Sequence, residues 1–232
     1  MFAIALLVYQ LSRALVIGDA SDAFNHALEI IHVEKAVGVF FESSIQQWML
    51  ENLHLTKFLN QFYIWAHLPV TALFFVWLYR RRSAAYGYVR NAFFVANGFA
   101  LAVFVVFPVA PPRLMTEQGF IDTVSIISGI DLHGGSLSGW FNPFAAVPSM
   151  HFGYALMVGV VGAVLVRTIY LRVLLLTYPL LVFLAIVGTG NHYVLDALAG
   201  GAVMLAAFGT TALWRRRHRG NTAAGSGHAC TG

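Results

Sequence analysis

The segment VLLLTYPLLVFLAIVGTGNHYVLDALAGGAVMLAAFGTTALW, residues 173–214, decides the fold class of this chain. Its two apolar runs, 173–187 and 197–214, are each near the length that an α-helix needs to cross about 30 Å of hydrocarbon. Between them lie His192 and Asp196, and no other acidic residue follows Asp131. A lone carboxylate so close to hydrocarbon costs roughly 2.5 to 3.5 kcal/mol, so it needs a partner and usually marks a functional site.

The composition of the chain indicates an integral membrane protein. Of its 232 residues, 59% are hydrophobic and 10% are charged, and the mean hydropathy is +0.72. Soluble domains carry about 25% charged residues. We expect an all-α integral membrane protein, a six-transmembrane helical bundle, because four further apolar runs of similar length occur at residues 2–17, 62–79, 89–109 and 152–166.

The first of these runs has a second interpretation. It could be a cleaved secretory signal, since Gly18 and Ala20 are small enough for a cleavage site, although no basic residue precedes the apolar stretch. With the run retained, we expect residues 1–217 to form a single membrane-embedded domain that carries the candidate functional site. Residues 218–232, which include the single cysteine Cys230, are polar and rich in small residues, so we expect a disordered cytoplasmic tail.

The basic residues predict the orientation of the bundle. Six alternating spans place ten arginines on one membrane face, which are Arg80, Arg81, Arg82, Arg90, Arg167, Arg172, Arg215, Arg216, Arg217 and Arg219. By the positive-inside rule this face is cytoplasmic, so both termini are expected inside a multi-pass plasma membrane protein. The formal charge of +4 is thereby accounted for by the membrane topology, and no nucleic-acid partner is expected.

Two long segments then face the outside. Residues 22–59 carry apolar side chains at helical spacing, which predicts amphipathic surface helices between spans one and two, or an outward helical hairpin packed on itself. Neither interpretation assigns chemistry to Glu29, Glu34 or Glu42. The second segment, residues 110–148, contains four prolines and a Gly/Ser cluster, so we expect irregular backbone.

The predicted topology brings Arg113, His151, His192 and Asp196 to the outer face. A His and an Asp four residues apart share one face of a helix, so the carboxylate can hold one imidazole nitrogen and leave the other as a nucleophile or base. The helix N-terminus beside them would suit a phosphate. The pair alone is also compatible with an ordinary intrahelical hydrogen bond.

Two further residues offer phosphate contacts. Ser149 is placed as the N-cap of the fourth span and could donate its hydroxyl, and Arg113 could bind phosphate in bidentate fashion. Each has a simpler explanation, since a lone arginine can be a headgroup anchor and a histidine such as His151 can be a satisfied interfacial residue. His67 and Asn97 stay unassigned, because hydrogen bonds between helices would satisfy both.

Taken together, the segments APPR (110–113), PSMH (148–151) and HYVLD (192–196) resemble the type 2 phosphatidic acid phosphatase superfamily. The likeness extends over about residues 67–201 and is greatest to the inositol phosphorylceramide synthase-like branch of inositol phosphotransferases. It implies that His192 attacks phosphorus, that Asp196 orients it, and that His151 protonates the leaving alkoxide and then deprotonates the acceptor. Arg113 and Ser149 would bind the phosphate, with no metal or cofactor.

The resemblance also implies the partners of the chain. The substrate would be a lipid phosphate ester at the extracytoplasmic leaflet, and the acceptor would be water or a polyol such as inositol. The chain departs from the superfamily pattern at Val106 and Ile186, which replace phosphate-binding cations, and at Leu114, which replaces proline. The inositol phosphotransferase branch has a similarly reduced cation set, and Arg13 either supplies a missing charge or extends to the interface.

Two other functions remain open from the sequence. A small proton-coupled membrane transporter could use the His-Asp pair as a relay, although no paired repeat is evident. A metal-dependent hydrolase could use His151, His192 and Asp196 as ligands, although their spacing fits no metal motif. The oligomeric state is left undetermined by the sequence.

Overall fold

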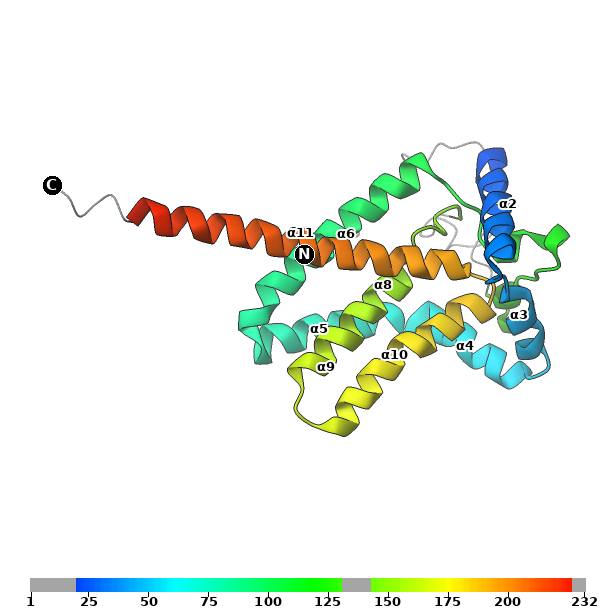
Figure 1. The fold of residues 1–232 in the computed structure, drawn as a ribbon. Coiled ribbons are helices and arrows are strands. Elements are labelled where there is room, and N and C mark those ends of the chain that lie inside the picture. Colours follow the sequence, from blue (N-terminus) through cyan, green and yellow to red (C-terminus); the bar gives the residue numbers. More distant parts are fainter. Residues whose placement is uncertain (1–19, 131–142, 227–232) are drawn as a thin grey trace.

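Figure 1 shows the computed structural model of the chain, which describes residues 20–130 and 143–226. Every regular element in these residues is a helix, and their one β contact is an isolated bridge between Val109 and Ala145. The predicted all-α class is therefore confirmed. The expected first span, Arg13 and Cys230 lie outside the described residues.

Three helices are long and apolar enough to cross a membrane, which supports the predicted membrane protein. They are α6 (Ser83–Val106), α10 (Ile169–Gly188) and the part of α11 (Val194–Ser226) that runs from Val194 to His218. At about 1.5 Å per residue, α11 from Val194 to Arg215 spans roughly 32 Å, close to the thickness of the hydrocarbon core.

The other two expected spans differ from the prediction. Residues 62–79 do not form one straight helix, because α4 (Leu53–Trp65) and α5 (His67–Arg81) meet at Ala66 with a bend of 50°. The fourth run is a shorter apolar helix, Met150–Leu165, built of α8 (Met150–Leu156), a π-helical turn η3 (Met157–Val161) and α9 (Gly162–Leu165). The described residues thus contain three candidate spans, or four if the bent pair is one span, and six spans stay a prediction.

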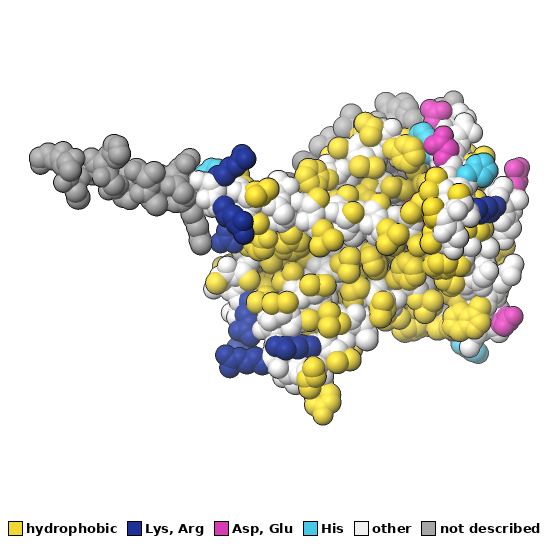
Figure 2. All heavy atoms as spheres, viewed as in Figure 1, with side chains coloured by type: hydrophobic (Ala, Val, Ile, Leu, Met, Phe, Trp, Pro, Cys, Tyr) yellow, Lys and Arg dark blue, Asp and Glu magenta, His cyan; other side chains and the backbone are white. Residues whose placement is uncertain are grey.

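The surface of the molecule is divided by charge. Figure 2 shows a broad belt of hydrophobic side chains, with most lysine and arginine side chains at one end and the acidic side chains at the other. Large apolar residues on the long helices are well exposed, including Leu205 at 72% and Val106 at 75%. Such a belt is what lipid contact requires. The separation of charge matches the predicted topology, but which end faces the cytoplasm stays a prediction.

The helices predicted between the first two spans are present as α2 (Ala20–Val37), α3 (Glu42–Leu50) and α4. They pack on the bundle, since α2 contacts α11 while α3 and α4 contact α10. In Figure 1 α2 and α3 lie at the end of the molecule where α11 begins. Their buried faces include two carboxyl groups, Glu34 and Glu42, to which the sequence alone assigned no role.

The described parts of the second outer segment, residues 110–130 and 143–148, are irregular apart from η1 (Pro112–Leu114), η2 (Thr116–Gln118) and the short helix α7 (Thr123–Ser128). Its backbone is satisfied by bonds to distant parts of the chain. The N–H of Ala110 donates to the carbonyl of Ala23 at 3.0 Å, and that of Arg113 donates to Gly190 at 2.7 Å. Buried irregular backbone needs such partners in place of water.

Two glycines let α8 approach α11 closely. A Cβ added at Gly200 would lie 2.0 Å from the carbonyl oxygen of Ser149, and one added at Gly153 would lie 3.0 Å from the carbonyl oxygen of Gly200. The backbone N–H of Ser149 donates to the carbonyl of Asp196 at 2.9 Å across this contact. The contact therefore places the start of α8 beside the start of α11.

The last helix, α11, continues to Ser226. The predicted end of the domain at residue 217 and the predicted disordered tail at 218–232 stay predictions. The stretch after Arg217 contains no proline to stop the helix. Residues 227–232 lie outside the part of the chain that the structure describes.

Candidate active site

A tight turn carries His192 between two long helices. The four-residue spacing predicted that His192 and Asp196 share one face of a helix. This is wrong, because α10 ends at Gly188 and α11 begins at Val194, so His192 precedes the helix. Gly190 has a φ of 73°, a left-handed conformation that side chains rarely adopt. The backbone N–H of His192 donates to the carbonyl of Ile186 at 3.0 Å, which closes the turn.

The imidazole of His192 is held through one nitrogen. Its Nδ1 atom lies 3.0 Å from the carbonyl oxygen of Ala146 and 3.3 Å from Oδ2 of Asp196. Because both partners are acceptors, the proton of the neutral ring is assigned to Nδ1, and Nε2 keeps its lone pair. The side-chain contact predicted between His192 and Asp196 is present, although it crosses a turn.

Burial sets the protonation state of this ring. His192 is 5% exposed, and desolvation together with the nearby charge of Arg113 lowers its pKa to about 3. The hydrogen bond to Ala146 acts in the opposite direction but does not compensate for burial. At neutral pH the ring is therefore uncharged, which is the state required of a nucleophile.

Asp196 is fully buried and is held in place by the backbone. Its Oδ2 atom accepts the N–H of Tyr193 at 2.9 Å in addition to its contact with His192. Oδ1 is buried and has no hydrogen-bond partner among the described residues. The carboxylate thus fixes both the imidazole and the first turn of α11.

His151 is the second residue of α8, and its ring lies beside that of His192. The ring centroids are 5.5 Å apart and the planes are inclined at 55°. His151 is partly exposed, whereas His67 on its other side is buried, with a centroid separation of 4.4 Å. The Tyr63 ring also lies 4.8 Å from His151. The structure therefore brings three imidazoles into a row.

The predicted N-cap role of Ser149 is only half met. Ser149 is the N-cap residue of α8 by its backbone, but its side chain makes no capping hydrogen bond. The Oγ atom is buried without a partner among the described residues, beside the peptide that contacts Asp196. A buried hydroxyl without a partner is uncommon and calls for an explanation, such as a ligand.

Arg113 is bound to the turn that carries His192. It lies in η1 and is buried, and its Nη1 atom donates to Oδ1 of Asn191. Asn191 in turn donates from Nδ2 to the Thr189 hydroxyl at 2.6 Å. No role was predicted for Asn191, and its place immediately before His192 was the only signal available. These contacts place a guanidinium charge close to the nucleophile candidate.

The N-terminus of α11 is not an anion site, contrary to our prediction. Three successive backbone N–H groups at its start already donate to carboxyl oxygens. The N–H of Tyr193 donates to Asp196, that of Val194 donates to Glu42 at 2.8 Å, and that of Leu195 donates to Glu34 at 2.7 Å. Positive helix ends attract any anion, and here side chains of the protein occupy the position. A phosphate would have to contact Arg113 and Ser149 instead.

No chemistry was assigned to Glu34 and Glu42 from the sequence, under either interpretation of the outer helices. A signal existed in their spacing. Glu34 follows Ala27 and Ile31 on the buried face of α2, and Glu42 shares the buried face of α3 with Gln46. A carboxylate that falls at the helical spacing of the apolar residues lies on the buried face of its helix, which indicates a buried hydrogen-bond partner for it.

The positions of the missing cations are apolar in the structure as in the sequence. Ile186 is buried at the end of α10, and Val106 is exposed at the end of α6. Neither residue offers a phosphate contact, so Arg113 is the cation that this region provides among the described residues. Within 20–130 and 143–226, no three His, Cys, Asp or Glu side chains are arranged to hold one metal ion.

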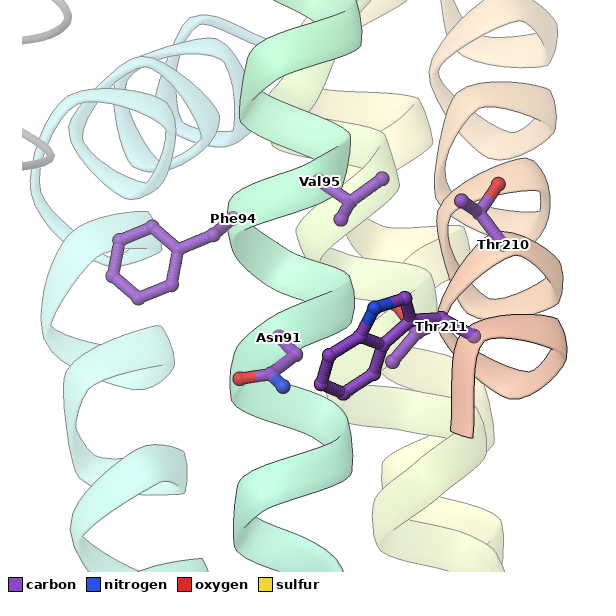
Figure 3. Close-up of a pocket in the computed structure, with 6 residues that line it drawn as sticks. Asn91, Phe94, Val95, Thr210 and Thr211 are labelled. Carbon is purple, nitrogen blue, oxygen red and sulfur yellow. The ribbon is translucent and has the colours of Figure 1, made fainter. Parts of the chain in front are cut away.

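Two cavities among the described residues are lined by side chains other than the imidazoles. One of about 360 Å³ lies between α6 and α11 and is lined by Asn91, Phe94, Val95, Thr210, Thr211 and Trp214, as Figure 3 shows. Another of about 440 Å³ lies between α5, η3 and α10. Both are open and mostly apolar, as expected of grooves between membrane helices.

Comparison with known proteins gives one family. No curated protein and no solved structure matches the chain significantly. The family model described as the PAP2 superfamily matches residues 28–210, a region that contains Arg113, Ser149, His151, His192 and Asp196. Since this match covers well over half of the 232 residues, the chain belongs to the PAP2 superfamily.

Proposed function

We propose that this protein is a membrane phosphatase or phosphotransferase that acts on a lipid phosphate ester through a phosphohistidine intermediate. Membership of the PAP2 superfamily supports the general chemistry, action on phosphate esters. The observation that carries the specific mechanism is the environment of His192. Its Nδ1 faces two acceptors, which leaves a lone pair on Nε2. The centroid of the His192 ring lies 5.5 Å from that of the His151 ring.

In the first half-reaction, Nε2 of His192 attacks phosphorus as the bond from phosphorus to the leaving alkoxide breaks. His151 takes part in this step as the imidazolium, donates a proton to that alkoxide and becomes neutral. Asp196 supports the positive charge that develops on the His192 ring, as the carboxylate does in a catalytic triad. Arg113 and the Ser149 hydroxyl stabilise the charge on the phosphoryl oxygens, which is the dominant requirement of phosphoryl transfer.

In the second half-reaction, the neutral His151 removes a proton from the acceptor. The acceptor oxygen forms its bond to phosphorus as the bond to Nε2 of His192 breaks. The same imidazole acts as acid and then as base, which microscopic reversibility requires. The acceptor is water in a phosphatase and a polyol in a phosphotransferase.

Inositol is the polyol that the sequence favours. The apolar Val106 and Ile186 stand where two cations are expected, as in the inositol phosphotransferase branch. The charge distribution supports a site on the extracytoplasmic leaflet. Arg215, Arg216 and Arg217 lie near the far end of α11 from His192, which by the positive-inside rule places the imidazoles outside.

The experiment is turnover of lipid phosphates by purified protein in detergent, with release of free phosphate and transfer to inositol measured in parallel. His192→Ala should abolish both while the protein still folds. His54, which is exposed at the start of α4, provides a matched control, because His54→Ala should leave turnover unchanged. Undiminished turnover by His192→Ala would refute the mechanism.

The row of His67, His151 and His192 also suits a proton relay, which keeps a proton-coupled transporter as a second candidate. Reconstitution into liposomes separates the two functions. A transporter moves solute without chemical conversion, whereas the proposed enzyme converts lipid phosphate without a proton gradient.

A further inference from the structure

Two carboxyl groups from the outer helices lie at the start of α11, next to the proposed nucleophile. Glu34 of α2 and Glu42 of α3 are both fully buried. The Oε1 atom of Glu42 accepts the N–H of Val194 at 2.8 Å, and that of Glu34 accepts the N–H of Leu195 at 2.7 Å. Because these N–H groups belong to consecutive residues, the two carboxyl groups meet at one place.

No described N–H or O–H group donates to the second oxygen of either carboxyl group. Oε2 of Glu34 and Oε2 of Glu42 are buried without a hydrogen-bond partner among the side chains and backbone described. Two ionised carboxylates at one buried place would repel each other and leave both of these oxygens unsatisfied. A single proton held between the two Oε2 atoms removes both difficulties.

The surroundings of the pair favour this proton. Burial, and then the hydrogen bond to Glu42, raise the pKa of Glu34 to about 9. The other titratable groups that face the pair are Asp196 and Tyr193 at the start of α11. Lys35, the neighbour of Glu34 in α2, lies over the Phe40 ring at 4.9 Å and does not neutralise the pair. Among the residues that the structure describes, no three His, Cys, Asp or Glu side chains are arranged to hold a metal ion beside the pair.

We propose that Glu34 and Glu42 form a proton-sharing carboxyl pair, with Glu34 donating to Glu42, that holds the first turn of α11 and thereby positions Asp196 and His192. The catalytic part of this inference rests on the function proposed above. Glu34 and Glu42 are positioning residues, because they contact the backbone of the helix and not the reacting atoms.

The positioning follows from three adjacent hydrogen bonds. The N–H groups of Tyr193, Val194 and Leu195 donate in succession to Asp196, Glu42 and Glu34. If the last two bonds are lost, the first turn of α11 is free to shift, and Oδ2 of Asp196 moves relative to Nδ1 of His192. A misplacement of about 1 Å in an active site can reduce the rate by about 100-fold.

Glutamine substitutions test the shared proton atom by atom. In Glu34→Gln or Glu42→Gln alone, Oε1 still accepts the backbone N–H and the new Nε2 donates to the remaining carboxylate. Each single variant should therefore melt no lower than the unsubstituted protein. In the double variant the NH₂ groups of two amides face each other, and neither group has an acceptor. Turning either amide around would place its NH₂ group against the backbone N–H, which is also a donor.

The double variant should consequently melt well below both singles, or fail to fold when both singles fold. Glu29→Gln, on the exposed face of α2, is the matched control and should have no effect alone or in combination. Additive losses, or a double variant as stable as the singles, would overturn the shared proton. So would loss of folding in either single variant.

The positioning role needs a readout other than stability. Glu34→Ala should lower the rate of phosphoenzyme formation by about 100-fold with little change in KM. Glu34→Gln should restore the rate, which a variant that merely loosened the protein would not show. Equal rates for Glu34→Ala and the unsubstituted protein would contradict the positioning role.

Failure of the proposed function is distinguishable from failure of this inference. The melting temperatures do not depend on turnover, and ¹⁵N NMR of labelled histidine reports the tautomer of His192 directly, with His192→Ala giving the assignment. We expect the Nδ1–H tautomer in the unsubstituted protein and in Glu34→Gln, and a mixture of tautomers in Glu34→Ala. An unchanged tautomer in Glu34→Ala would overturn the positioning role even if no lipid phosphate is turned over.

Discussion

Nδ1 of His192 lies 3.3 Å from Oδ2 of Asp196, and the same carboxylate oxygen also accepts the N–H of Tyr193 at 2.9 Å. One buried carboxylate thus connects the imidazole to the backbone of α11. Its charge, as well as its shape, matters in the proposed mechanism, because His192 becomes positively charged when it is phosphorylated. This relationship gives the first of four predictions.

Asp196→Asn preserves an oxygen acceptor at this position but removes the charge. We expect phosphoenzyme formation to fall on the order of 10⁴-fold, as when the orienting carboxylate of a catalytic triad is replaced by an amide. Rapid-quench measurement of the first half-reaction checks this. Asp22→Asn, on the exposed start of α2, is the control. A loss of less than tenfold would show that Asp196 is structural only.

The effect of His151→Ala on phosphoenzyme formation should depend on the leaving group of the substrate. A substrate that releases an alkoxide needs a proton donor, whereas one that releases p-nitrophenolate does not, so only the first should lose phosphoenzyme formation. With the activated substrate the phosphoenzyme should accumulate, because the second half-reaction still needs a base. Equal losses with both substrates would argue against His151 as the general acid.

Gly200→Ala should separate α8 from α11. The added Cβ would lie 2.0 Å from the carbonyl oxygen of Ser149, so we expect the free energy of unfolding to fall by about 1 to 3 kcal/mol. Gly209 lies in the same helix with no atom within 4 Å of such a Cβ. Gly209→Ala should change that free energy by less than about 1 kcal/mol. Denaturation in detergent compares them, and equal effects would contradict the close contact.

The stability of the protein should depend on pH through Glu34. The pKa of this carboxyl is about 9 in the folded protein against 4.5 ordinarily, so its contribution is complete below pH 4.5 and is lost as the pH rises through about 9. Glu34→Gln does not titrate there. The melting temperature of the unsubstituted protein should therefore fall relative to Glu34→Gln between about pH 6.5 and about pH 9. Parallel curves would contradict this assignment.

The histidine ring of the site does not interfere with that comparison. The pKa of His192 is lowered to about 3, so its own effect on stability falls between this value and its ordinary 6.5. Within that window stability rises with pH, which is opposite in sign to the effect of Glu34. Above it, the difference between the two proteins reports the Glu34–Glu42 pair.

Much of the fold could be predicted from the sequence because membrane helices depend on local composition. The apolar runs at 173–187 and 197–214 appear as α10 and α11. The bend at Ala66 was not predicted, since the apolar run continues through it and nothing in the local sequence marks the change of direction. Hydropathy reports where hydrocarbon can be, and not whether a helix is straight.

The site divides in the same way. The proximity of His151, His192 and Asp196 could be predicted, because alternating spans place their ends on one face. The roles of Glu34 and Glu42 could not be predicted, because their hydrogen-bond partners are distant in the sequence. The partner of Glu34 lies 161 residues further along the chain, and that of Glu42 lies 152 residues further. A carboxylate on an amphipathic helix suggests solvent until the position of the partner is known.

The most direct test of the account is the identity of the phosphorylated residue. The protein is mixed with a lipid substrate labelled at phosphorus, quenched with denaturant under alkaline conditions that preserve phosphoramidates, and mapped by mass spectrometry. The account predicts an acid-labile phosphoryl group on Nε2 of His192, and no labelled protein in His192→Ala. Label on another residue, or labelling of His192→Ala equal to that of the unsubstituted protein, would contradict it.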